Sequence, residues 1–298
     1  MFDIKLADKR ISIINLYSYS EELCRNYILG VNESESIPTD MTVKISEDDI
    51  EYERRKSEQE DLKEGIPVRH FDDDYLESLA VYRKIAEKMP EYDTVLFHGS
   101  CISVDGMGFL FTAKSGTGKS THTRLWKELL GDRVMMVNDD KPLIKIIRQD
   151  LERKCVAIAY GTPWAGKHEL SCNISVPLKA VCILERSRDN SISRISKAEA
   201  YPMLMQQVYR PSDTEAMKKT LDLIDKIDVK LYRLCCNMDI SAAELSYARP
   251  SPASTAPTSC WPRTSTAPPR KPGSASSSSA AASSARSSRS SWPGRAGK

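Results

Sequence analysis

The sequence predicts an α/β protein, with a mixed β-sheet built around a phosphate-binding loop and with helices packed against the sheet. Three consecutive segments support this prediction. Residues 108–112 are a short apolar run of the kind found in buried strands. Residues 113–120, AKSGTGKS, have the spacing of a phosphate-binding loop with Ala at the first glycine position. Residues 119–130 then show the apolar spacing of a helix, which Gly131 is placed to end.

The loop residues suit a nucleotide for physical reasons. Small residues let backbone N–H groups turn around a phosphate chain, and the N-terminus of the following helix adds positive potential. Lys119 can reach the β- and γ-phosphate oxygens, and the Ser120 hydroxyl can ligate Mg²⁺. We therefore expect ATP and Mg²⁺, with Mn²⁺ as an alternative metal. The predicted nucleotide-binding residues are Ser115, Gly116, Thr117, Gly118, Lys119, Ser120 and Thr121.

Two adjacent carboxylates follow the next apolar run. Residues 134–137, Val-Met-Met-Val, predict a strand, and Asp139 and Asp140 come just after it. Carboxylates at the end of a strand near a phosphate-binding loop are suited to hold the metal of a bound nucleotide. This pair makes nucleotide binding a stronger prediction than the glycine-rich loop alone would.

A histidine is predicted upstream of the loop on a paired strand. Residues 94–104 have the composition of a strand, and Asp105-Gly106 predicts a tight hairpin turn that leads into the strand before the loop. His98 should therefore lie beside the loop. The alternative is a half-buried strand histidine without a chemical role.

The order of these motifs resembles one family. His98-Gly99, a hairpin, SGTGKST at residues 115–121 and then Asp139-Asp140 resemble HPr kinase/phosphorylase and its structural relatives, the ATP-dependent phosphoenolpyruvate carboxykinases. The glycine-rich run is more similar to the carboxykinases, whereas the His-Gly hairpin and the chain length are more similar to the HPr kinase catalytic domain. The resemblance implies a P-loop kinase core of that type.

The resemblance also implies roles for the predicted catalytic residues. Lys119 would neutralise the β- and γ-phosphates, while Ser120 and Asp140 would hold the metal. Asp139 would accept the proton of the acceptor hydroxyl, and His98 would tune or relay that proton. The order within the Asp139/Asp140 pair could be reversed.

The predicted function is that of an ATP-dependent phosphotransferase (kinase) that transfers the γ-phosphate to a hydroxyl of a protein, peptide or small molecule. Two alternatives are open: a non-catalytic, regulatory nucleotide-binding module, and carboxykinase-like chemistry. A pure binding module has no use for a second carboxylate and His98, so their presence favours an enzyme. Whether the reverse phosphorolysis also occurs is open.

A second loop is a candidate for the acceptor site. Residues 161–168, GTPWAGKH, follow a predicted strand, and their Gly, Pro and Trp content is typical of an ordered surface loop that lines a site. Lys167 and His168 could compensate negative charge on the acceptor or on the transferred group. The alternative is a loop that is merely well packed, with its charges in solvent.

Composition excludes several classes of function. Eight of the 43 basic residues and none of the 41 acidic ones fall in residues 248–298, so residues 1–247 hold 35 basic and 41 acidic side chains, a net of −6. Such an acidic body predicts no nucleic-acid partner. The eight cysteines show no C-x-x-C or zinc pattern and predict reduced thiols. No signal peptide or membrane-length apolar run is evident, so the expected location is cytoplasmic. A homo-oligomer remains an open alternative.

The chain divides into three predicted parts. Residues 1–92 predict an N-terminal α/β segment that packs on the core, and residues 93–247 the P-loop kinase-like domain. Residues 248–298 are rich in Ala, Ser, Pro and Arg, with no aliphatic residue larger than Ala, and predict a disordered tail. Their composition and the helical pattern that stops near residue 247 also fit an out-of-frame translation.

Overall fold

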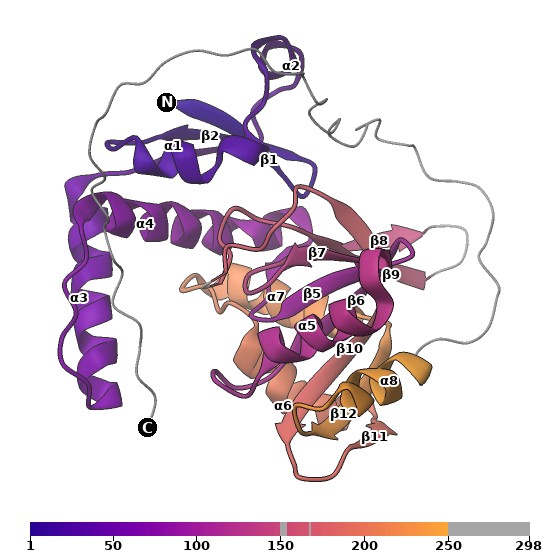
Figure 1. Ribbon diagram of the computed structural model, residues 1–298. Helices are drawn as coiled ribbons and strands as arrows, with labels where there is room; N and C mark the ends of the chain where they lie inside the picture. Colours follow the sequence, from indigo (N-terminus) through magenta and orange to yellow (C-terminus); the bar gives the residue numbers. More distant parts are fainter. Residues whose placement is uncertain (150–153, 167, 250–298) are drawn as a thin grey trace, which may run out of the picture. The chain divides into compact units, whose positions relative to one another are not determined.

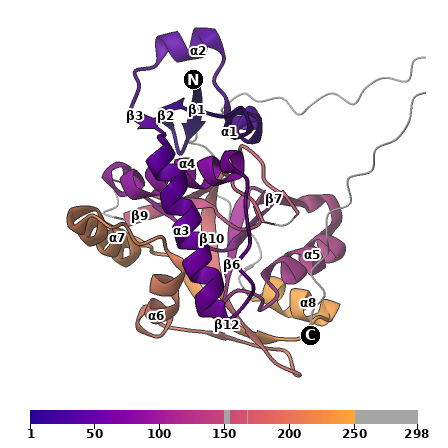
Figure 2. The same cartoon turned by 90° about the vertical axis from the view of Figure 1, so that its left-hand side faces the viewer.

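The computed structural model describes residues 1–149, 154–166 and 168–249, and all of these fall in one compact unit (Figures 1 and 2). Nearly all of the tail predicted at residues 248–298 lies outside the described residues. The origin of the tail therefore stays a prediction. The domain boundary predicted at residue 92 also stays a prediction. No helix in the described part of the chain is long and apolar enough to cross a membrane.

A curled mixed sheet organises the structure, as predicted for an α/β protein. Its path is β4-β8-β9-β10-β6-β5-β7, with β12 paired to β10 and β11 paired to β12. The strands are β4 (Thr94–Leu96), β5 (Ser100–Val104), β6 (Met107–Thr112), β7 (Val134–Asn138), β8 (Leu143–Gln149), β9 (Lys154–Tyr160), β10 (Ser175–Arg186), β11 (Ser191–Arg194) and β12 (Lys230–Cys236). Strand β10 joins two halves, because its first residues pair antiparallel with β9 and its later residues pair parallel with β6 and β12.

Helices cover both faces of the β10-β6-β5 region, and the alternation of side chains along each strand explains why (Figure 1). Phe109 and Phe111 join the apolar cluster that includes Trp126 of α5 (Lys119–Leu130) and Ala243 of α8 (Ile240–Ala248). Leu110, between them, joins the cluster under α6 (Lys197–Gln207) and α7 (Thr214–Lys226). The central strands are therefore buried on both faces and anchor the loop that leaves β6.

The N-terminal segment forms a small sheet of its own, from β1 (Phe2–Leu6), β2 (Lys9–Ile14) and β3 (Met41–Lys44). Its apolar side chains pack on α4 (Asp73–Lys88), and Leu96, Leu143 and Trp164 from the larger sheet and its loops join the same cluster. The helices of this segment are α1 (Tyr19–Leu23), α2 (Val31–Ser36), α3 (Glu47–Glu64) and α4 (Asp73–Lys88), with short 3-10 turns at Arg25–Tyr27 and Met89–Tyr92. Residues 1–92 thus contact the core through α4.

The strand predicted over residues 94–104 is interrupted, and this is a correction. The chain pairs with β8 as β4 and then with β6 and β7 as β5, and it changes partners at residues 97–99. A Cβ on Gly99 would lie 2.8 Å from Leu110 Cδ1 and 3.0 Å from the Phe111 carbonyl oxygen, so a side chain there would force β6 to shift. His98 is consequently in a break between two strands rather than on one strand.

Two other local predictions need correction. The sequence of residues 20–29 predicts a short helix, but α1 ends at Leu23, because Ile28 bridges Ile4 and Leu29 N–H donates to the Asp3 carbonyl, which draws the segment alongside β1. The edge strand β11 was not predicted from its polar sequence.

Candidate functional site

Three chain segments meet at one edge of the sheet because of strand direction. Strand β5 runs antiparallel to both β6 and β7 and lies between them. The carboxyl ends of β6 and β7 and the start of β5 therefore share an edge. The loop of residues 113–118 leaves β6 there, Asp139 and Asp140 follow β7, and His98 precedes β5.

The loop between β6 and α5 has the backbone of an open cradle. Gly116 and Gly118 have φ values of +77° and +119°, which disfavour any side chain, and no other atom lies within 4 Å of a Cβ built on either. A turn with Thr117 N–H donating to the Lys114 carbonyl at 3.2 Å shapes the loop. Ser120 and Thr121 lie in the first turn of α5, so the loop ends at a helix N-terminus that favours anions.

A chain of polar contacts links the loop to the carboxylate pair. Lys119 is 8% exposed, and its Nζ lies 3.2 Å from His98 Nε2. The same Nε2 lies 3.1 Å from Asp140 Oδ1, while Asp140 Oδ2 accepts from Lys141 Nζ at 2.7 Å. One imidazole nitrogen cannot accept from Lys119 and donate to Asp140 at the same time. The position of one proton on His98 therefore decides which neighbour it binds.

The two aspartates have different surroundings. Burial raises the pKa of Asp139. The hydrogen bond from Gly166 N–H, at 2.5 Å, lowers this pKa by a smaller amount. Burial also acts to raise the pKa of Asp140, but the hydrogen bond from His98 and the charge of Lys141 outweigh it and hold that pKa far below its usual range. Asp139 Oδ2 is buried without a hydrogen-bond partner. Asp139 is thus the more basic carboxylate, and Asp140 is the one held ionised.

The acceptor loop predicted at residues 161–168 lies against Asp139 through Gly166. Its His168 is exposed, and the protonated form of this imidazole would lower the pKa of Asp139. Lys167, the other predicted acceptor residue, lies outside the described residues. In the described ranges, no three His, Cys, Asp or Glu side chains gather as a ready-made metal site.

Two residues at this edge were missed by the sequence analysis. Asn138 donates through Nδ2 to Thr162 O, Thr162 Oγ1 and Trp164 O at 3.0–3.2 Å, and its Oδ1 accepts from the N–H groups of Asp140 and Lys141. It therefore joins the acceptor loop to the carboxylate pair. The only signal in the sequence was its place before Asp-Asp.

Arg186 is the second residue that was missed. It ends β10, the parallel neighbour of β6, and its guanidinium donates to the carbonyls of Gly116 and Thr117. These carbonyls belong to the loop whose N–H groups are predicted to bind phosphate, so Arg186 holds the cradle from outside. Its sequence context, a polar turn after an apolar run, gave no sign of this contact.

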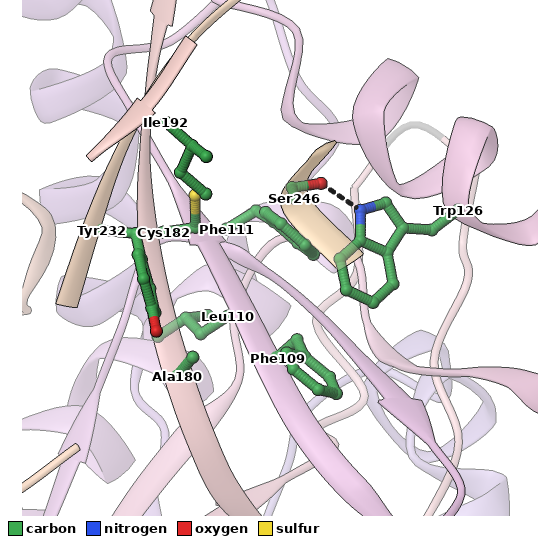
Figure 3. A pocket seen from close by; sticks show the side chains of 9 residues that line it. All are labelled: Phe109, Leu110, Phe111, Trp126, Ala180, Cys182, Ile192, Tyr232 and Ser246. Atoms are coloured by element: carbon green, nitrogen blue, oxygen red, sulfur yellow. Dashed lines mark hydrogen bonds between the residues drawn. The ribbon is translucent and has the colours of Figure 1, made fainter. Parts of the chain in front are cut away.

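A small cavity lies elsewhere, between the sheet and the helices α5 and α8 (Figure 3). Phe109, Phe111, Trp126 and Cys182 are among its lining residues, and its volume is about 10 Å³. One water molecule would fill it. It is a gap in the packing of the core rather than a ligand site.

Comparisons with known proteins identify one matching family. The model of a family described as SynChlorMet cassette protein ScmC matches residues 70–241, more than half of the chain. No curated protein matches the sequence. Among solved structures, the Hpr(Ser) kinase/phosphatase from Coxiella burnetii is similar at 11% identity and a TM-score of 0.29, over 52% of this chain and 95% of that one.

Proposed function

We propose that this chain, which belongs to the family described as SynChlorMet cassette protein ScmC, is an ATP-dependent phosphotransferase that acts on a hydroxyl group. The proposal comes from the chemistry of its site. The observation that carries the proposal is the convergence of a glycine loop, Lys119, His98 and the Asp139/Asp140 pair at one sheet edge. Binding alone would need the loop and one carboxylate. The second carboxylate, buried and made more basic, has a use in proton transfer.

The residues present fit a nucleotide with its metal. The cradle at Gly116 and Gly118 is open to a phosphate chain, and the unpartnered Oδ2 of Asp139 leaves one buried oxygen available. Bound ATP with Mg²⁺ would supply the transferable group and neutralise its charge. Ser120 and Asp140 are the residues that would hold the metal, which in nucleotide sites is commonly bound by one or two carboxylates, phosphates and water.

The transfer assigns each residue a task. The acceptor oxygen forms a bond to the γ-phosphorus as the bond from that phosphorus to the β–γ bridging oxygen breaks, and ADP leaves with the electron pair. The hydroxyl proton passes to Asp139, whose raised pKa makes it the better proton acceptor of the pair. Lys119 stabilises the charge on the phosphate oxygens, and His98 Nε2 positions Asp140 when it carries a proton and Lys119 when it does not.

The test separates binding from transfer. Lys119→Ala should weaken binding of MgATP, measured by titration calorimetry, by about 10- to 100-fold, the value of a lost charge-assisted hydrogen bond. Asp139→Asn should leave that affinity largely unchanged and lower transfer by about 10²- to 10⁴-fold. Lys114→Ala is the matched control, since Lys114 is an exposed lysine of the same loop.

The MgATP affinity and the turnover together decide each outcome. Turnover is followed as phosphate release in water and as transfer of label from γ-labelled ATP to hydroxyl compounds. Full turnover in Asp139→Asn removes Asp139 as the base. Normal MgATP affinity in Lys119→Ala removes the loop as the nucleotide site. Binding without turnover in the wild-type protein favours the regulatory module.

A further inference from the structure

Lys141, to which the proposed function gives no task, is a fixed neighbour of Asp140. Its backbone N–H donates to Asn138 Oδ1 at 2.5 Å, and its carbonyl accepts from Thr162 Oγ1 at 2.8 Å. These two bonds hold the backbone of Lys141 just after β7. Its Nζ lies 2.7 Å from Asp140 Oδ2, and both side chains are 27% exposed. The ammonium can therefore change its partner, but it stays at this edge of the sheet.

Positive charge surrounds the Asp140 carboxylate. Lys141 Nζ contacts Oδ2, and the other oxygen, Oδ1, is 3.1 Å from His98 Nε2. Lys119 Nζ lies 3.2 Å from the same imidazole nitrogen. Burial lowers the pKa of Lys119, the charge of Asp140 acts to raise it, and the charge of Lys141 acts to lower it, as expected for two ammonium groups near one carboxylate. Two lysines thus share the negative charge of Asp140.

This arrangement disfavours a metal ion that arrives alone. A divalent cation at Asp140 must compete with Lys141 for the carboxylate and is repelled by the ammonium charge. Within the part of the chain that the structure describes, no three His, Cys, Asp or Glu side chains gather to compensate for that repulsion. A nucleotide changes both conditions, because its phosphates attract ammonium groups and also supply oxygen ligands for the metal.

We propose that Lys141 is an exchangeable counter-ion of Asp140: it moves from the carboxylate to the phosphates of an arriving nucleotide, so that a divalent cation reaches Asp140 only together with that nucleotide. The inference rests on the proposed function, in which Asp140 holds the metal. Lys141 thereby keeps free metal ions away from Asp140 and gives the phosphates a second cation beside Lys119.

The first experiment titrates the full-length protein with Mn²⁺ alone and measures the free ion by its electron paramagnetic resonance signal. Lys141→Met removes the charge and keeps a side chain of similar length, so this variant should bind Mn²⁺ about 10-fold or more tightly than the wild type. Lys141→Arg keeps the charge and should behave as the wild type. Lys114→Met is the matched control: it removes one charge from an exposed lysine of the neighbouring loop and should change the affinity by less than about 2-fold.

A second measurement tests where the ammonium moves. ATP is titrated in the presence of EDTA and its binding is followed by calorimetry. Lys141→Met should weaken this binding by about 10-fold, the value of one charge-assisted hydrogen bond to phosphate, and Lys141→Arg should retain most of the affinity. In the Mn²⁺ titration, the double variant Asp140→Asn, Lys141→Met should lose the tighter binding, since the ion is then deprived of its carboxylate.

Three results would overturn this inference alone. Equal Mn²⁺ affinities of the wild type and Lys141→Met mean that Lys141 does not exclude the metal. Tighter Mn²⁺ binding that persists in the double variant means that the ion binds elsewhere. Unchanged ATP affinity of Lys141→Met in EDTA means that the ammonium does not reach the phosphates. A wild-type protein that binds ATP neither with nor without Mg²⁺ contradicts the proposed function and, with it, this inference.

Discussion

Two helix pairs of this protein are held together by different forces. Helix α3 joins α4 largely through charge: Arg83 bonds Glu53 and Asp49, and Lys84 Nζ lies 2.6 Å from Asp49. Helix α5 joins α8 through aromatic packing around the fully buried Trp126, whose ring is 5.6 Å from that of Tyr247. The first pair leaves a groove of about 250 Å³, and the second leaves a gap of about 10 Å³.

The two kinds of contact have different effects on the space between the helices. Directional ion pairs hold two helices in register without filling the space between them, so one side of the molecule keeps room for a ligand. Dispersion between rings needs close contact and eliminates space. The predicted phosphate-binding loop precedes α5 of the tightly packed pair, and the groove of about 250 Å³ belongs to the charged one. The comparison can be broken or sharpened by four predictions.

Trp126→Ala should have the largest effect. Trp126 packs against Phe109 and Phe111 at ring-centroid distances of 5.1 and 5.3 Å, so its truncation leaves a cavity at the back of α5. The free energy of unfolding in urea should fall by about 3–5 kcal/mol. Met135→Ala, at a residue that is 51% exposed, should change it by less than about 0.5 kcal/mol. Equal effects of the two substitutions would contradict a packed α5–α8 contact.

Arg83→Met should test the charged pair. It leaves the buried Glu53 without its close partner, whereas the half-buried Asp49 keeps Lys84, and loss of one partner of a buried ion pair costs about 3 kcal/mol of unfolding free energy. Arg55→Met removes an exposed pair with Glu51 on the same helix and should cost about 0.3–0.5 kcal/mol. If Arg83→Met is neutral, apolar contacts rather than charge hold α3.

The pH dependence should also separate the two pairs. Burial lowers the pKa of His122 on α5 from 6.5 to about 4. Between these values the unfolded chain binds a proton that the folded chain does not, so stability falls as pH drops, by up to about 3 kcal/mol in total. His122→Gln should flatten this slope, and His70→Gln, at an exposed site, should not.

For the α3–α4 pair, stability should be lost over a lower range of pH. Burial acts against the Asp49 carboxylate, but hydrogen bonds from Lys84 and Ser46 hold its pKa at about 2. Stability from Asp49 is complete above the unfolded value of 3.8 and is lost as pH falls toward 2. For His122, the contradicting result would be a His122→Gln protein whose unfolding free energy changes with pH between 6.5 and 4 as in the wild type. The pH dependence would then not come from the lowered pKa of His122.

Ser246→Ala should have the smallest effect. Trp126 Nε1 donates to Ser246 Oγ at 2.8 Å, and it keeps His122 Nε2 at 3.1 Å as an acceptor when the hydroxyl is removed. The unfolding free energy should fall by about 1 kcal/mol. Ser241→Ala, which removes an exposed hydrogen bond with Asn190, should cost less. A loss well above 1 kcal/mol would mean that α8 depends on this one hydroxyl.

Local signals predicted the part of the fold that depends on local chemistry. The bounds of α5, Lys119–Leu130, agree with the sequence, because a glycine-rich start and an amphipathic spacing specify a helix without reference to its neighbours. The Asp105-Gly106 hairpin is likewise formed, with both residues at positive φ. The interruption at residues 97–99 was not predictable in this way, since it exists because β4 and β5 pair with different strands.

The candidate site shows the same division. Lys119, Asp139 and Asp140 belong to motifs, and the sequence alone singled them out. Asn138 and Arg186 are single residues with partners 24 to 70 residues away, Thr162 for the first and Gly116 for the second, so only the folded structure reveals these contacts. The different environments of the two aspartates also depend on such distant partners, among them Gly166 and His98.

The hydrogen bonds of Asn138 limit which residues can replace it. Its nitrogen faces three acceptors and its oxygen faces two donors, so the amide fits in one orientation only. Aspartate, of the same shape, would set oxygen against oxygen, and leucine would remove the hydrogen bonds made by the Thr162 carbonyl and by the N–H groups of Asp140 and Lys141. The narrowest mutational tolerance at this edge therefore belongs to a residue with no proposed contact to either reactant, and an inventory of the site drawn from ligand contacts would omit it.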